Sequence, residues 1–162
     1  MDIGTTSIRM LIVGITGDRS YSILSRQKEM IRLGDGEFDD ETLKPEAMER
    51  ALIVCRRFSE MARAFDVEEI TTVATSAVRD ARNQTAFVSR LREEAGLDVR
   101  VVSGLEEARL IYLGVSRSVH IVDGPALFID VGGGSTEIIV GDNEDYTAIH
   151  SLQSRNAAAC RE

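Results

Sequence analysis

Short runs of aliphatic and β-branched residues alternate with longer amphipathic stretches along most of the chain. The first two runs, Ile8 to Ile15 and Tyr21 to Ile31, flank a Thr-Gly-Asp turn signal and therefore predict a β-hairpin. Later runs predict further strands at Ile70 to Ala74, Val99 to Val102, Ala126 to Val131, Thr136 to Val140 and Tyr146 to Leu152. The run from Ala126 is apolar enough to predict a buried strand, and the one after it would return as its hairpin partner.

Three stretches repeat apolar residues at spacings of three and four, which is the period of an amphipathic helix. The first begins at Pro45, which is tolerated in a first turn, and its apolar stripe continues to Phe65. The second covers roughly Asn83 to Ala95 and the third Glu106 to Val119. The resulting order, βββαβαβα followed by a β-hairpin, predicts an α/β fold with a mixed sheet flanked by helices.

Two loops share one design, namely Asp2 to Ser7 (DIGTTS) and Asp130 to Thr136 (DVGGGST). In each, a strand ends in Asp, and a turn rich in Gly, Ser and Thr leads into the next strand. Glycine lets successive backbone amides form a concave nest for phosphate oxygens, and the Asp can hold magnesium or orient a water. A plain glycine-rich hairpin turn explains either loop alone. The repetition of the whole pattern favours a pair of phosphate loops.

Composition and charge exclude several other classes of protein. A formal net charge of −8 over 162 residues argues against nucleic-acid binding, although a few arginines and glycine-rich amides can still hold a polyanion. The apolar runs are too short to span a bilayer, so no integral membrane association is expected. Cys55 and Cys160 lie far apart without a neighbouring ligand, which disfavours a zinc site and favours a reducing, cytoplasmic location.

The paired Asp-x-Gly hairpins resemble the phosphate loops of the superfamily of actin, sugar kinases and heat-shock chaperone ATPases. Within it, the chain resembles the exopolyphosphatase / guanosine pentaphosphate phosphohydrolase family over most of residues 2 to 141. The segments that carry this resemblance, in the family's order, are DIGTTSIRMLIV from Asp2, RLGDG from Arg32, ATSAVRDARN from Ala74, SGLEEARLIYLGV from Ser103 and FIDVGGGSTEI from Phe128. The resemblance implies an actin-like (ribonuclease H-like) fold.

The resemblance also implies an activity: hydrolysis of the terminal phosphate of inorganic polyphosphate, or of the 5′ phosphate of guanosine pentaphosphate, with Mg²⁺. Glu107 matches the catalytic base, which would accept a proton from the attacking water. Asp130 and Glu137 match acidic positions near the metal and the water. Without the motif, Glu106 and Glu107 would be first-turn helix carboxylates, Asp130 a turn residue and Glu137 an outward-facing strand residue.

The phosphate would be bound by both loops and by an arginine that follows the strand ending at Ala74. The matching residues are Gly4, Thr5, Thr6, Ser7, Arg79, Gly132, Gly133, Gly134 and Ser135. An arginine suits this role because its planar fork can donate two hydrogen bonds to a phosphate. A surface salt bridge is the structural alternative for Arg79, and a solvated loop charge explains Arg32 equally well.

Two departures from the family lead us to expect a chain truncated at both ends. Almost nothing precedes Asp2, where relatives have an apolar strand, and the resemblance fades after Leu152. We therefore expect an actin-like first domain at 1–122 with its first strand nearly missing, and an incomplete second domain at 123–162. Open strand edges favour self-association, for example as a homodimer.

The function that these expectations favour is an impaired phosphohydrolase. A non-catalytic module that binds polyphosphate or an alarmone nucleotide is the alternative, and a kinase-like ATPase is a third candidate. The EEARLIYLGV segment beside GGGSTE disfavours the kinase, because sugar kinases and actins do not carry that combination. The sequence does not choose between polyphosphate and guanosine pentaphosphate.

Overall fold

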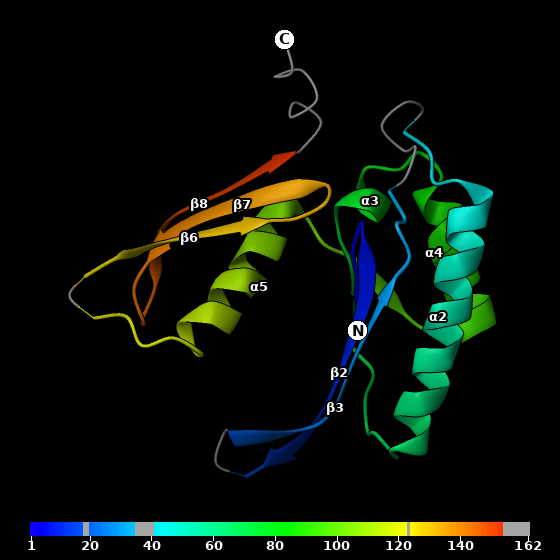
Figure 1. Ribbon diagram of the computed structural model, residues 1–162, viewed down its shortest axis with the longest axis horizontal. Helices are drawn as coiled ribbons and strands as arrows, with labels where there is room; N and C mark the ends of the chain where they lie inside the picture. Colours follow the sequence, from blue (N-terminus) through cyan, green and yellow to red (C-terminus); the bar gives the residue numbers. More distant parts are fainter. Residues whose placement is uncertain (18–19, 35–40, 123, 154–162) are drawn as a thin grey trace. The chain divides into compact units, whose positions relative to one another are not determined.

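The computed structural model describes residues 1–17, 20–34, 41–122 and 124–153 (Figure 1). The chain divides into two compact units, Met1–Val101 and Val102–Glu162. Both combine a β-sheet with helices, which confirms the predicted α/β class. The expected boundary after residue 122 falls inside the second unit, and as a statement about domains it stays a prediction. No helix in the described ranges is both long enough and apolar enough to cross a membrane.

The first unit is built on a five-stranded mixed sheet with the order β3-β2-β1-β4-β5. Its strands are β1 (Asp2–Ile3), β2 (Ser7–Thr16), β3 (Ser20–Met30), β4 (Thr72–Ala74) and β5 (Val99–Val101). The predicted hairpin is confirmed, because β2 and β3 pair antiparallel along their length. The short strand β1 is antiparallel to β2 and parallel to β4, so two residues join the hairpin to the parallel half of the sheet.

The helices of the first unit are α2 (Pro45–Ala64), α3 (Ser76–Arg79) and α4 (Gln84–Ala95), and α2 packs beside α4 (Figure 1). The apolar stripe of α2 is buried as its spacing predicts, with Leu52, Cys55 and Phe58 all within 1% of full burial. This helix stripe packs into one core with sheet residues such as Ile3 and Ile8. Because that core is continuous from helix to sheet, it fixes the strand ends from which the loops project.

The second unit consists of α5 (Gly104–Ser116) and an antiparallel sheet of β6 (Ala126–Val131), β7 (Ser135–Gly141) and β8 (Tyr146–Gln153), in the order β6-β7-β8. Helix α5 packs along one face of this sheet (Figure 1). The centre of the packing is formed by Ala108, Tyr112 and Ile139. The Tyr112 hydroxyl donates a hydrogen bond to the Asp142 carbonyl oxygen at 2.9 Å, which anchors the middle of the helix to the sheet.

The prediction of a buried strand at Ala126 to Val131 was wrong. Leu127, Ile129 and Val131 are 60%, 58% and 75% exposed. Successive side chains of a strand point to opposite faces, and α5 covers only the face that carries Phe128. Within the described part of the second unit, no element covers the other face. An apolar run therefore identified the strand correctly, but it could not reveal which of its faces is covered.

Candidate active site

The two predicted phosphate loops have the same backbone geometry. The Gly4 amide donates to the Ser7 carbonyl oxygen at 3.0 Å, and the Gly132 amide donates to the Ser135 carbonyl oxygen at 2.9 Å. A Cβ atom added at either glycine would lie 3.1 Å from that same serine oxygen, which is a tight contact. Each loop thus reverses the chain within four residues, one in each unit.

Both loops also place their serine at the start of a strand and bury it. Ser7 begins β2 and is 7% exposed, and Ser135 begins β7 and is 3% exposed. The intervening residues stay more accessible: Thr6 and Gly133 are exposed, and Gly134 is half-buried. The sequence suggested one design in two copies, and the backbone hydrogen bonds and the burial of the serines agree with it.

The first loop contacts the segment that carries Arg79. Thr5 Oγ1 and Ser76 Oγ lie 3.0 Å apart in a side-chain hydrogen bond. Ser76 begins the short helix α3 and Arg79 ends it, so Arg79 follows the strand β4 as expected and lies on a helical turn that was not predicted. Its Nε lies 3.5 Å from Asp80 Oδ1, and both side chains are largely buried, at 17% and 16% exposed. A salt bridge of Arg79 is therefore present, but it joins two largely buried side chains and does not lie on the surface.

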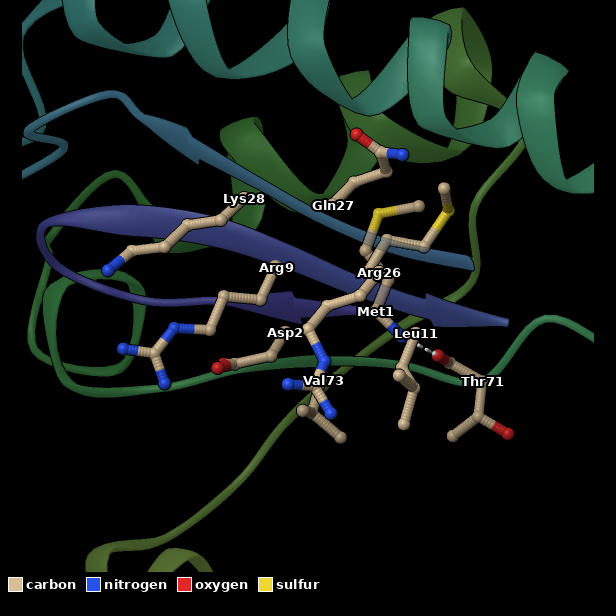
Figure 2. Close-up of a pocket in the computed structure, with 10 residues that line it drawn as sticks. Met1, Asp2, Arg9, Leu11, Arg26, Gln27, Lys28, Thr71 and Val73 are labelled. Atoms are coloured by element: carbon tan, nitrogen blue, oxygen red, sulfur yellow. Dashed lines mark hydrogen bonds between the residues drawn. The ribbon is translucent and has the colours of Figure 1, made fainter. Parts of the chain in front are cut away.

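A cavity of about 640 Å³ lies beside β1 in the first unit (Figure 2). Its walls include the side chains of Asp2, Arg9, Leu11, Arg26 and Lys28. In the β2–β3 register Arg9 lies opposite Lys28 and Leu11 opposite Arg26, so the cationic groups come from two neighbouring strands. Of the acids predicted to serve the loops, Asp2 reaches this cavity. The predicted phosphate-binding residues of this unit, all within the described ranges, do not line it.

In the second unit, Asp130, Glu137 and Ser151 form a row across the three strands. Asp130 pairs with Glu137 in the β6–β7 register, and Glu137 pairs with Ser151 in the β7–β8 register. Residues that are directly opposite in an antiparallel sheet lie on the same face. This face is the one that α5 covers, since Phe128 and Ile139 lie on it two residues away.

Glu137 is the most deeply buried carboxylate of this row. Its side chain is 1% exposed, so the structural alternative of an outward-facing strand residue is wrong. The Ser151 hydroxyl donates a hydrogen bond to Glu137 Oε1 at 2.8 Å. Burial of a carboxylate is costly unless it is hydrogen-bonded, and Ser151 supplies one such bond. Asp130, at the end of the neighbouring strand, stays exposed.

Helix α5 begins directly against this row. Ser103 caps the helix, with its hydroxyl oxygen accepting a hydrogen bond from the Glu106 amide at 3.1 Å. The next residue, Gly104, touches β8: an added Cβ would lie 2.7 Å from Ser151 Cβ and closer still to its Oγ. Glycine is thus required at this position, because any side chain there would push the first turn of the helix away from Ser151. Gly104 lies in the SGLEEARLIYLGV motif and Ser151 in the strand predicted at Tyr146 to Leu152, but no local pattern predicts their contact, because it depends on the tertiary packing.

The two glutamates of this first turn differ in their surroundings. Glu106 forms an ion pair with Arg109, with Oε1 and Nη1 3.5 Å apart. Glu107 is half-buried, and its amide donates to the Ser103 carbonyl oxygen at 2.8 Å. At 100° per residue, Glu107 lies on the flank of the packed face that includes Ala108 and Ile111. Glu107 therefore lies at the edge of the sheet-facing side of the helix.

The acidic residues suit magnesium better than a metal held by protein ligands alone. Nowhere in the described residues do three or more His, Cys, Asp or Glu side chains gather as a metal site. Asp130 and Glu137, which are cross-strand neighbours, offer two carboxylates. Mg²⁺ is typically bound by one or two carboxylates together with substrate phosphates and water, so the donor set fits that ion.

The chain matches the family model described as the Ppx/GppA phosphatase family over residues 11–154. It is 32% identical to an exopolyphosphatase from Cytophaga hutchinsonii, with a TM-score of 0.92 over 99% of this chain and 52% of that one. It is also 32% identical to the Ppx/GppA family member of Aquifex aeolicus, with a TM-score of 0.81 over 93% of this chain and 49% of that one.

The ethanolamine utilization protein EutJ from Carboxydothermus hydrogenoformans shares the fold alone, at 16% identity and a TM-score of 0.51. The chain spans about half the length of the Ppx/GppA structures that it matches. These likenesses confirm the predicted actin-like fold. Together with the matched motifs they identify the lineage: this chain belongs to the Ppx/GppA phosphatase family.

Proposed function

We propose that the chain carries the phosphate-binding and water-activating groups of an enzyme that hydrolyses the terminal phosphate of inorganic polyphosphate. The observation that supports this most is the row of Asp130, Glu137 and Ser151 beside the first turn of α5. It gathers carboxylates on one sheet face, next to a loop whose backbone has the geometry of the first loop. Carboxylates beside a glycine-rich anion site are the components that metal-assisted phosphoryl transfer to water requires.

In this proposal each residue has a defined task. Glu107 accepts a proton from the water that attacks the terminal phosphorus. Asp130 and Glu137 hold Mg²⁺, which would offset the negative charge of the phosphate oxygens. The amides of Gly132, Gly133 and Gly134 and the Ser135 hydroxyl bind phosphate oxygens in the second loop. In the first unit, the residues that bind phosphate are Gly4, Thr5, Thr6, Ser7 and Arg79.

Polyphosphate is the favoured substrate, because the similar structure from Cytophaga hutchinsonii is described as an exopolyphosphatase. Guanosine pentaphosphate is the second candidate. Since the chain spans about half of that relative, we expect weak hydrolysis or none from the 162 residues alone. Catalysis depends on groups held to within fractions of an ångström, and a partial set of them is poorly preorganised. Cys55 is a buried free thiol, which is compatible with the proposed cytoplasmic location.

A non-catalytic module that binds polyphosphate or an alarmone nucleotide is the second candidate function. The two glycine loops with buried serines favour it, because anion binding by backbone amides needs no catalytic base. The two functions differ in their dependence on Glu107. Hydrolysis requires that carboxylate, whereas binding by the loops does not.

The test is phosphate release from long-chain polyphosphate with Mg²⁺, measured for the chain, for Glu107→Gln and for Glu106→Gln. Glu106→Gln is the matched control, since it removes a neighbouring carboxylate that is already paired with Arg109. Release that disappears in Glu107→Gln and persists in Glu106→Gln supports catalysis. Binding of polyphosphate without release supports the binding module. Equal release by all three proteins would contradict the role of Glu107.

A further inference from the structure

Arg32 occupies a backbone conformation that arginine rarely adopts. Its φ is +48°, in the left-handed region, which disfavours residues that have a Cβ. It directly follows Ile31 and precedes Leu33, which are 3% and 0% exposed, whereas Arg32 itself is exposed. The turn thus buries both neighbours and leaves the arginine on the surface.

Backbone hydrogen bonds explain the turn. The amides of Ile31 and Arg32 both donate to the Thr6 carbonyl oxygen, at 3.0 and 2.9 Å, and the Gly34 amide donates to the Thr5 carbonyl oxygen at 3.1 Å. These bonds hold the segment from Ile31 to Gly34 against the first phosphate loop. They require the left-handed conformation but do not require an arginine. Glycine or asparagine would adopt the same backbone at a lower cost.

Packing does not explain the choice of arginine either. The side chain of Arg32 is exposed, and it has no ion pair or hydrogen bond within the part of the chain that the structure describes. Among the exposed arginines of this unit, Arg57 is paired with Glu29 and Arg82 with Glu41, whereas Arg32, like Arg9 and Arg26, has no ion pair within the described residues. A residue that is held in a strained backbone conformation, and whose side chain has no structural partner, is typical of a functional site.

We propose that Arg32 is a phosphate-binding residue, whose guanidinium binds phosphates of a chain held at the Gly4–Ser7 loop. The inference rests on the proposed function, because it adds a ligand contact to that same site. Two segments that carry an arginine are hydrogen-bonded to this loop. The segment of Arg32 donates to the carbonyl oxygens of Thr5 and Thr6. The helix of Arg79 is bonded to it through the hydroxyls of Ser76 and Thr5. A guanidinium can bind phosphate oxygens with two charge-assisted hydrogen bonds.

Arg32→Gly separates this role from a structural one. Glycine relieves the left-handed strain, so the urea midpoint of the variant should be unchanged or higher. If the guanidinium binds phosphate, the dissociation constant for polyphosphate should nevertheless rise about tenfold, which corresponds to a lost charge-assisted contact. Arg32→Lys keeps the charge but not the fork, and its affinity should lie between those of the other two proteins.

Asp66→Gly is the matched control for strain. Asp66 is also exposed and left-handed, with a φ of +55°, and it follows the C-terminal end of α2. Its replacement should leave the dissociation constant for polyphosphate within about twofold of the unchanged chain, because it touches neither loop. Binding is measured by calorimetry at low and moderate salt, with long-chain polyphosphate, tripolyphosphate and guanosine pentaphosphate as probes. Comparison of the dissociation constants for the three probes distinguishes an inorganic phosphate chain from a nucleotide as the source of the phosphates.

The outcomes separate this inference from the proposed function. If the chain binds polyphosphate and Arg79→Lys weakens binding while Arg32→Gly does not, the role of Arg32 is refuted and the proposed function stands. A strong loss of stability in Arg32→Gly would also overturn the argument, because it would mean that the arginine is structural. If the unchanged chain binds none of the three probes, both the inference and the proposed function fail for this chain.

Discussion

Replacement of Gly104 by alanine tests how closely α5 must approach the sheet that carries the candidate carboxylates. The new Cβ would lie 2.7 Å from Ser151 Cβ, whereas two non-bonded carbon atoms prefer about 3.5–4.0 Å. Rotation of the serine hydroxyl cannot relieve this contact, because Cβ does not move with χ1. The first turn of α5 must therefore shift by about 1 Å, and the hydrogen bond from Ser151 to Glu137 shifts with it.

The expected magnitude follows from two opposing terms. Overpacking of a close contact costs about 1–3 kcal/mol, while the higher helix propensity of alanine offsets up to about 1 kcal/mol. We expect a net loss of about 1–2 kcal/mol in the free energy of unfolding of the second unit. Gly114→Ala, in the same helix, is the matched control, because an added Cβ there meets nothing within 4 Å. That variant should be as stable as the original chain or more stable.

The assay combines urea unfolding of the chain with hydrogen exchange of the β7 and β8 amides. The exchange rates of these amides report on the second unit alone. Gly104→Ala should exchange faster than the original chain, and Gly114→Ala should not. Ser151→Gly removes the opposing Cβ but also the hydrogen bond to Glu137, so it should destabilise the unit by itself. Combined with Gly104→Ala, it should cost less protection than the sum of the two single variants. Equal protection in the two alanine variants would refute the close contact, and with it the argument that Gly104 positions the helix.

Two further predictions concern a core thiol and an exposed sheet face. Burial raises the pKa of the Cys55 thiol to about 12, whereas an unfolded thiol ionises near about 8.5. The stability that comes from keeping this thiol neutral is therefore fully present below the pKa of the unfolded thiol, and it is lost as pH rises above that pKa, by up to about 1.4 kcal/mol per pH unit. The free energy of unfolding should fall from about pH 8.5 to about pH 10 in the original chain, and it should fall less in Cys55→Ala. Ile129 is 58% exposed on the uncovered face of β6. If this face drives self-association, Ile129→Lys should lower the weight-average mass measured by sedimentation. An unchanged mass would show that this face does not drive self-association.

Periodicity in the sequence predicted most of the elements because it records which residues are buried together. The stripe that starts at Pro45 gave a helix that begins at that residue and ends at Ala64. The helix α3 escaped prediction because four residues are too few to display a period. The apolar run at Ala126 to Val131 indicated a strand but not its exposure, since an apolar residue carries no record of what covers it.

The candidate site was predictable where one motif contains it and unpredictable where two elements meet. The likeness of the two loops could be read from Asp, Gly and Ser in the same order. The burial of Glu137 could not, because alternation along β7 places it with Ser135 and Ile139 without revealing which face α5 covers. The contact of Gly104 with Ser151 depends on helix docking, which no local pattern records.

The two units carry complementary chemistry around loops of the same geometry. Two arginines lie on segments that are bonded to the first loop, Arg32 through backbone hydrogen bonds and Arg79 through the helix that begins at Ser76. Beside the second loop lie carboxylates, with Glu137 buried in the same row as Asp130. On the proposed function, the arginines of the first unit and the amides of both loops bind a polyanion, whereas the carboxylates of the second unit hold a metal and take a proton from water. Binding can then survive a change that abolishes hydrolysis, and Arg32→Gly should impair the first task while Glu107→Gln impairs the second.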